Sequence, residues 1–112
     1  MKWGTEEQKK KYLPILAKGE KIGAFAGTEP NAGSDLGAMQ TTAVKKGKKY
    51  IINGDKTFIT SGPEAGIIIV FAVTDKEAGA KGISAFIVED DFKGYKVGSV
   101  FDKLGINASR TS

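Results

Sequence analysis

The chain has 112 residues, of which 40% are hydrophobic and 27% are charged. The length allows one domain, and the composition is typical of a globular protein and not of a disordered one. Its net charge is +4 and its pI is near 9.3. The chain contains neither cysteine nor histidine. Disulfides, zinc sites and catalysis by a thiol or a Ser-His pair are therefore excluded.

A short helix is predicted near the N-terminus. Thr5, followed three residues later by Gln8, fits a capping box at the start of a helix. Pro14 is expected either to break this helix or to lie in the first turn of a second short one. Gly19 is a typical residue for the end of the helical segment.

After Gly19 the periodicity changes from helical to extended. Gly47 between lysines, and the pair Asn53-Gly54, predict the tips of two hairpins. Residues 67–71 are apolar without alternation, which predicts a strand covered on both faces. The fold class expected is mainly β, an antiparallel two-sheet sandwich or partly open barrel with a short N-terminal helical lead-in. The predicted strands are residues 22–26, 39–44, 50–52, 57–60, 67–73, 83–88 and 95–100, and residues 106–112 resemble another strand, cut at Ser112.

Two segments contain residue types suited to ligand binding. Residues 24–35, AFAGTEPNAGSD, place Gly33 and Ser34 in a loop, where glycine allows close backbone approach and a hydroxyl suits a polar or anionic group. In residues 55–62, DKTFITSG, Phe58 could stack on a flat ring and Thr60 could donate a hydrogen bond at its edge. Taken singly, the first segment is better explained by a plain turn between two strands, and the second by a core strand.

Together and in this order, the two segments resemble the acyl-CoA dehydrogenase family. TEPNAGSD at residues 28–35 resembles the family's signature, and GDKTFIT at residues 54–60 resembles its second flavin-contacting strand. Residues 81–88 and 102–106 are further matches, and the resemblance covers nearly the whole chain from Gly4 onward.

The resemblance implies a fold, a cofactor and a substrate class. Residues 21–112 would be the middle β-domain of an FAD-dependent oxidoreductase that dehydrogenates acyl-CoA thioesters, of the short-chain, butyryl type. Residues 1–20 would be the tail of its N-terminal helical domain. The partners implied are the rest of a longer chain, a neighbouring subunit of a homo-oligomer, and electron-transferring flavoprotein as acceptor.

The resemblance also implies roles for individual residues. Thr28 would hydrogen-bond the pyrimidine side of the flavin, Phe58 would pack on the ring, and Thr60 would reach the reactive nitrogen. Ser34 would lie where FAD and the CoA thioester meet, and so would also bind substrate. The implied cofactor-binding residues are Phe25, Ala26, Gly27, Thr28, Gly33, Ser34, Phe58, Ile59 and Thr60.

No catalytic residue and no metal ligand is expected within the chain. The family's proton-abstracting glutamate belongs to the C-terminal helical domain, so the fragment alone is expected to be inactive. Glu29 is expected to have a structural, hydrogen-bonded role. Three departures from the family pattern are Gly27, where a branched aliphatic residue is usual, Asn107, where arginine is more common, and Ala80, where some relatives have serine.

Two other functions remain open. The basic charge and short strands are compatible with a nucleic-acid-binding β-barrel, although all of the 17 basic residues except Arg110 are lysine and bidentate recognition depends on arginine. A purely structural β-module is the other alternative. No segment predicts a signal peptide or a bilayer-spanning helix, so the expected location is the cytoplasm, with no membrane partner.

Overall fold

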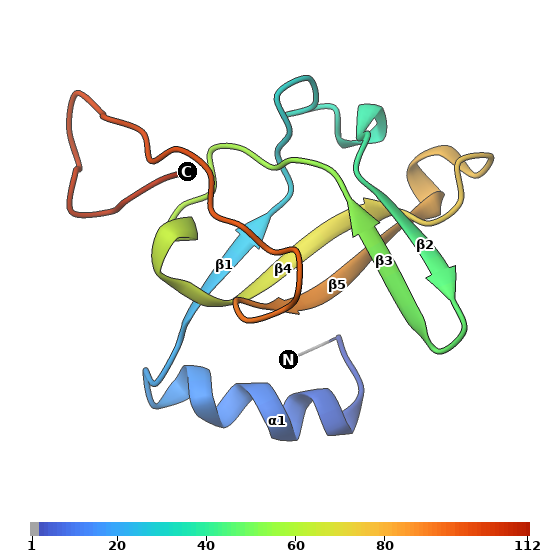
Figure 1. The fold of residues 1–112 in the computed structure, drawn as a ribbon, viewed down its shortest axis with the longest axis horizontal. Coiled ribbons are helices and arrows are strands. Elements are labelled where there is room, and N and C mark those ends of the chain that lie inside the picture. The colour runs from blue at the N-terminus through green and yellow to red at the C-terminus, as the bar shows by residue number, and fades with distance from the viewer. Residues whose placement is uncertain (1–2) are drawn as a thin grey trace.

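The computed structural model describes residues 3–112 as one N-terminal helix followed by a β-rich body (Figure 1). The regular elements are α1 (Glu6–Ala17), β1 (Ile22–Ala26), β2 (Thr42–Lys46), β3 (Lys49–Asn53), β4 (Ala65–Val73) and β5 (Ile83–Glu89), with short 3-10 helices η1 (Leu36–Ala38), η2 (Gly62–Glu64) and η3 (Gly79–Gly82) between them.

Helix α1 begins and ends as the sequence predicts. The Thr5 hydroxyl accepts from the Gln8 backbone N–H, and the Gln8 side chain accepts from the Thr5 N–H, which completes the capping box. Gly19 follows the helix with a φ of +70°, and Glu20 N–H donates to the Ile15 carbonyl. Pro14 lies inside the single helix and does not break it.

The strands form one mixed sheet built around β4. Strand β1 pairs with β4 in parallel, β5 pairs with it antiparallel, and β2 touches the end of β4 at Val73. Strands β2 and β3 form a hairpin with Gly47 at its tip, as predicted. Ile67 and Ile68, which point to opposite faces of β4, are both almost fully buried, so this strand is covered on both faces.

The mainly β prediction is confirmed, but the predicted antiparallel two-sheet sandwich is wrong because the sheet is single and mixed. Residues 57–60, 95–100 and 106–112 are not strands in the described chain; only an isolated bridge joins Thr60 to Thr111. Asn53-Gly54 ends β3 without forming a hairpin. Gly54 instead passes so close to Thr41 that a Cβ on it would lie 2.3 Å from the Thr41 Oγ1.

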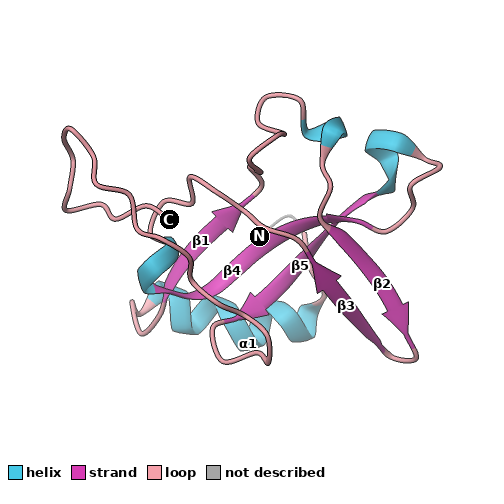
Figure 2. Cartoon of the chain, turned by 45° about the horizontal axis from the view of Figure 1, so that its top comes forward, coloured by secondary structure: helices cyan, strands magenta, loops and turns pink. Residues whose placement is uncertain are grey.

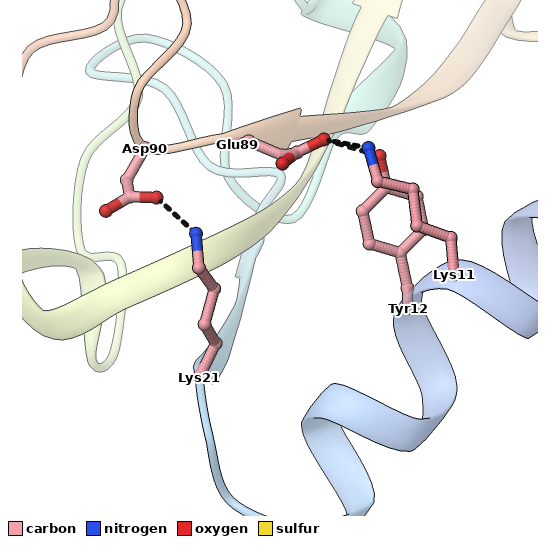
Figure 3. Close-up of polar contacts among 5 residues, drawn as sticks. All are labelled: Lys11, Tyr12, Lys21, Glu89 and Asp90. Carbon is pink, nitrogen blue, oxygen red and sulfur yellow. Dashed lines mark hydrogen bonds and ion pairs between the residues drawn. The ribbon is translucent and has the colours of Figure 1, made fainter.

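Helix α1 lies along one side of the sheet (Figure 1). The Leu16 Cδ2 lies 3.3 Å from the position that a Cβ on Gly23 would take, so glycine permits this approach. At the end of β5, Glu89 Oε1 accepts from Lys11 Nζ at 2.6 Å and from the Tyr12 hydroxyl at 2.8 Å (Figure 3). These hydrogen bonds, from Lys11 first and then from Tyr12, lower the pKa of Glu89.

A small apolar core lies on one face of the sheet. Ala26, Ile59, Ala65 and Ile68 form a buried cluster, and Tyr95 packs against it. Tyr95 belongs to the segment after β5, which runs across the sheet (Figures 1 and 2). Within this core, Ala26 at the end of β1 packs in the same cluster as Ile59. This packing brings together the two segments of the candidate site.

Candidate functional site

Residues 28–35, here called the signature loop, follow β1 and fold back on themselves. Glu29 N–H donates to the Ala32 carbonyl at 2.8 Å, and Ala32 N–H donates to the Glu29 carbonyl at 3.2 Å. Pro30 and Asn31 form the tip between these two bonds, as their turn chemistry predicts. The loop is thus a short closed turn with a fixed conformation.

The Glu29 carboxylate fixes the base of this loop. It accepts from Gln40 N–H at 2.6 Å, from Thr41 N–H at 2.9 Å and from Lys56 Nζ at 2.8 Å. The side chains of Glu29 and Lys56 are only 5% and 10% exposed. Burial raises the pKa of Glu29, but the Lys56 hydrogen bond and the backbone donors outweigh it and hold the pKa at about 2. The geometry therefore supports the structural role expected for Glu29.

The second predicted segment lies beside the first. Thr57 N–H donates to the Thr28 carbonyl at 3.0 Å, and Lys56 Nζ donates to the Gly27 carbonyl at 3.2 Å. Ala26 and Ile59 share the buried core cluster. About 30 residues of sequence separate the two segments, and the fold brings them into direct contact.

Two aromatic rings of the site remain open to solvent. Phe25 is 62% exposed and Phe58 is 64% exposed, although both are large apolar side chains. Phe25 contacts the Phe71 ring at a centroid distance of 5.0 Å. Gly27 leaves room for the Phe25 ring, because a Cβ on Gly27 would lie 3.0 Å from Phe25 Cε1.

The polar positions differ in their exposure. The Ser34 and Thr60 residues are exposed and Thr28 is half-buried. Gly33 has a φ that any residue adopts and open space where its Cβ would point, so no neighbour within the described chain requires glycine there. Ala26 and Ile59 are buried, so their side chains are core and only their backbone groups could contact a ligand.

Sequence reasoning missed three contributors to the site. The segment 110–112 pairs with residues 59–61: Ile59 N–H donates to the Ser112 carbonyl at 2.7 Å, and Ser112 N–H donates back at 3.2 Å. Lys56 neutralises Glu29, and the Phe101 ring stacks on Phe58. All three depend on contacts between distant segments, for which the sequence carries no local signal.

The described residues show two further properties. Within residues 3–112, no helix has the length and apolar character needed to cross a bilayer. The same range contains no group of three or more carboxylates placed to hold a metal ion. The exposed lysines of residues 45–49 lie on the β2–β3 hairpin, where Tyr50 is 45% exposed and pairs with Lys45. Phe25 and Phe58 lie on other elements, on β1 and before η2.

Comparisons with known proteins point to one family. The family model for the acyl-CoA dehydrogenase middle domain matches residues 24–112. The short-chain-specific acyl-CoA dehydrogenase of Clostridium acetobutylicum is 62% identical over 109 residues, which are 97% of this chain and 29% of that protein.

Two solved structures show the same fold. Butyryl-CoA dehydrogenase from Megasphaera elsdenii has a TM-score of 0.93 and 52% identity, covering 97% of this chain and 29% of that one. A glutaryl-CoA dehydrogenase from Mycobacterium smegmatis in complex with FADH2 has a TM-score of 0.89 and 41% identity, covering 98% and 27%. The chain thus spans less than a third of the length of these relatives.

Proposed function

Since the chain belongs to the acyl-CoA dehydrogenase family, as its middle domain, we propose that it binds FAD and an acyl-CoA thioester within a longer enzyme that α,β-dehydrogenates the thioester. The observation that carries this proposal is the contact between Thr28 and Thr57, which unites the two segments that resemble the family's flavin-binding elements. The complex of the glutaryl-CoA dehydrogenase relative with FADH2, the reduced form of FAD, supports the choice of cofactor.

The residues present fit an isoalloxazine ring. Phe58 offers an exposed aromatic surface for stacking, and Thr28 and Thr60 bring hydroxyl groups from the two joined segments. Gly33 leaves open space in which a ligand could approach the backbone, with the Ser34 hydroxyl next to it. Bound FAD would supply the acceptor for the hydride from the substrate's β-carbon, and Thr60 would hydrogen-bond the flavin edge that receives it.

Proton abstraction is assigned to a residue outside this chain. Glu29 lies within the first of the two segments, as Asp35 does, and Asp55 lies within the second. Of these, Glu29 has a pKa of about 2 and three hydrogen-bond donors, which leave it a weak base. Its carboxylate is also committed to holding the loop, so removing a proton would require breaking buried hydrogen bonds. The chain supplies the wall of the flavin site and not the base.

The proposal includes a domain division and partners. Residues 1–20 end an N-terminal helical domain and residues 21–112 form the middle domain, with α1 and the sheet on the two sides of this boundary. The rest of a longer chain and a neighbouring subunit enclose the flavin, and electron-transferring flavoprotein accepts its electrons. Short-chain acyl groups are the proposed substrates, in line with the similarity to the short-chain-specific relative.

The decisive experiment is the substitution Thr60→Ala in the longer enzyme. We expect loss of one hydrogen bond to shift the flavin absorbance and to slow anaerobic reduction by butyryl-CoA roughly fivefold, from about 1 kcal/mol. Thr60→Ser, which keeps the hydroxyl, is the matched control and should retain both properties. An unchanged spectrum and an unchanged reduction rate in Thr60→Ala would show that Thr60 does not contact the flavin.

A further inference from the structure

The Phe58 and Phe101 rings form a face-to-face pair. Their centroids lie 5.0 Å apart and the ring planes differ by 13°, which is the geometry of an offset stack. Phe58 is still 64% exposed and Phe101 is 40% exposed. The pair therefore uses one part of the Phe58 ring and leaves the rest of its surface open.

The backbone of Phe58 is held in an uncommon conformation. Its φ is +57°, in the left-handed region that bulky residues seldom adopt. Its two neighbours are fixed by hydrogen bonds, Thr57 N–H to the Thr28 carbonyl and Ile59 N–H to the Ser112 carbonyl. These bonds fix where the side chain leaves the backbone, but they do not fix the torsion of the ring itself.

Phe101 is tied to the same part of the chain. Phe101 N–H donates to the Thr111 carbonyl at 2.8 Å, and Thr111 lies between the residues that pair with Ile59 and Ser61. Lys103 Nζ also contacts the Ser109 carbonyl and donates to Thr111 Oγ1 at 3.2 Å, across the same loop. The segment that orders the backbone around Phe58 thus also brings the Phe101 ring to it.

We propose that Phe101 is a positioning residue for the flavin site, because its ring holds that of Phe58 in one rotamer and leaves the open surface of Phe58 for the isoalloxazine. The inference rests on the proposed function, which makes Phe58 part of the flavin wall. Phe101 acts through Phe58 and not on the reacting atoms. A preorganised ring loses less side-chain freedom when a ligand stacks on it, and this raises affinity.

The direct test measures the Phe58 side chain without any ligand. NMR of the labelled chain should show contacts between the two rings and a single Phe58 χ1 rotamer. Phe101→Leu should cause χ1 averaging, whereas Phe101→Tyr should keep one rotamer. Leu104→Ala is the control in the same loop, because the Leu104 side chain is fully exposed, and it should change nothing. A single Phe58 rotamer retained in Phe101→Leu would overturn the inference.

A second measurement connects the rotamer to the cofactor. In an FAD titration followed by flavin fluorescence and visible circular dichroism, Phe101→Leu should weaken binding roughly 2- to 10-fold, the range expected for loss of an aromatic pair. Phe101→Tyr and Leu104→Ala should stay within about twofold of the unsubstituted longer enzyme. Equal affinity and equal flavin dichroism in Phe101→Leu would overturn the inference. The titration is carried out in the longer enzyme, because the rest of that chain and a neighbouring subunit complete the proposed flavin site. Failure of the unsubstituted longer enzyme to bind FAD would count against the proposed function, while the rotamer measurement would still decide the role of Phe101.

Discussion

The substitution Glu29→Gln tests the buried ion pair under the signature loop. Folding lowers the pKa of Glu29 from its ordinary 4.5 to about 2. At about 1.4 kcal/mol per pH unit, this difference corresponds to about 3 kcal/mol of stabilisation at neutral pH. Glutamine keeps the size of the side chain but leaves the Lys56 ammonium, which is 10% exposed, without its counter-charge, and breaking such a pair costs about 3–5 kcal/mol. We therefore expect Glu29→Gln to lower the free energy of unfolding at pH 7 by about 3 kcal/mol.

The pH dependence gives the same prediction an independent check. Because the folded-state pKa of Glu29 is depressed, its contribution is fully present above the unfolded value of 4.5 and is lost as the pH falls towards 2. Urea unfolding of the parent chain and Glu29→Gln, followed by circular dichroism at several pH values, should give free energies of unfolding that differ by about 3 kcal/mol at pH 7 and converge only as the pH falls to about 2. The difference between the free energies of unfolding of the two proteins cancels the contribution of the other carboxylates, which both proteins share.

Glu64→Gln is the matched control. It makes the same chemical change in the Arg110–Glu64 pair, whose side chains are 54% and 33% exposed, and an exposed pair contributes at most about 1 kcal/mol. The reasoning is refuted if Glu29→Gln destabilises the chain no more than Glu64→Gln does, or if the parent and Glu29→Gln lose stability in parallel between pH 5 and pH 2.

Two further predictions concern packing and the attachment of α1. Gly54→Ala should cost about 1–3 kcal/mol in a thermal or urea melt, because its Cβ would lie 2.3 Å from Thr41 Oγ1, whereas Gly98→Ala, with open space around the new methyl, should be nearly neutral. Glu89→Gln should change the melting temperature little, since the Lys11 partner is 57% exposed and ion pairs with such exposed groups contribute little, yet it removes the charge that Lys11 contacts at 2.6 Å. Trypsin should then cleave α1 sooner than in the parent chain, as mass spectrometry would show, and an unchanged cleavage rate would mean that Glu89 does not hold the helix.

Local chemistry was sufficient to predict the helix ends and one hairpin. The Thr5 capping box, the Gly19 stop and the Gly47 turn each depend on residues within a few positions of one another. Pro14 was harder, because a proline inside a helix removes one hydrogen bond but does not force a break where the freed carbonyl can face water. Helix α1 buries none of its residues, so water can reach the carbonyl that Pro14 leaves without a donor.

The errors in the strand predictions have a common cause. Residues 57–60 have β-branched and aromatic residues typical of a strand, but Phe58 and Ser61 adopt left-handed φ values of +57°, and the backbone partners come from residues 28 and 110–112. Asn53-Gly54 has the composition of a hairpin tip, yet Gly54 is needed for its close approach to Thr41. In both places a distant segment, invisible to local patterns, decides the conformation.

For the candidate site, the sequence pointed to two segments and the structure shows how they lie. The family resemblance pointed to two candidate segments, and the structure joins them through Thr28 and Thr57. The resemblance could not distinguish side chains that face a ligand from side chains that face the core. It therefore assigned the same cofactor-binding role to Ala26 and Ile59 as to Phe25 and Phe58. Burial separates them, since the first two are 4% and 7% exposed and the other two are more than half exposed.

The parallel pairing of β1 with β4 sets an order for folding during synthesis. Phe25 lies opposite Ile69, 44 positions later in the chain, so a ribosome adding about 5–20 residues per second needs roughly 2 to 9 seconds to supply the partner strand. The β2–β3 hairpin, with Lys46 opposite Lys49, can close in about 1–10 μs once it emerges. Throughout that interval β1 carries unpaired backbone groups and the apolar side chains of Ile22 and Phe25, so the nascent chain is most vulnerable to aggregation before β4 has left the ribosome.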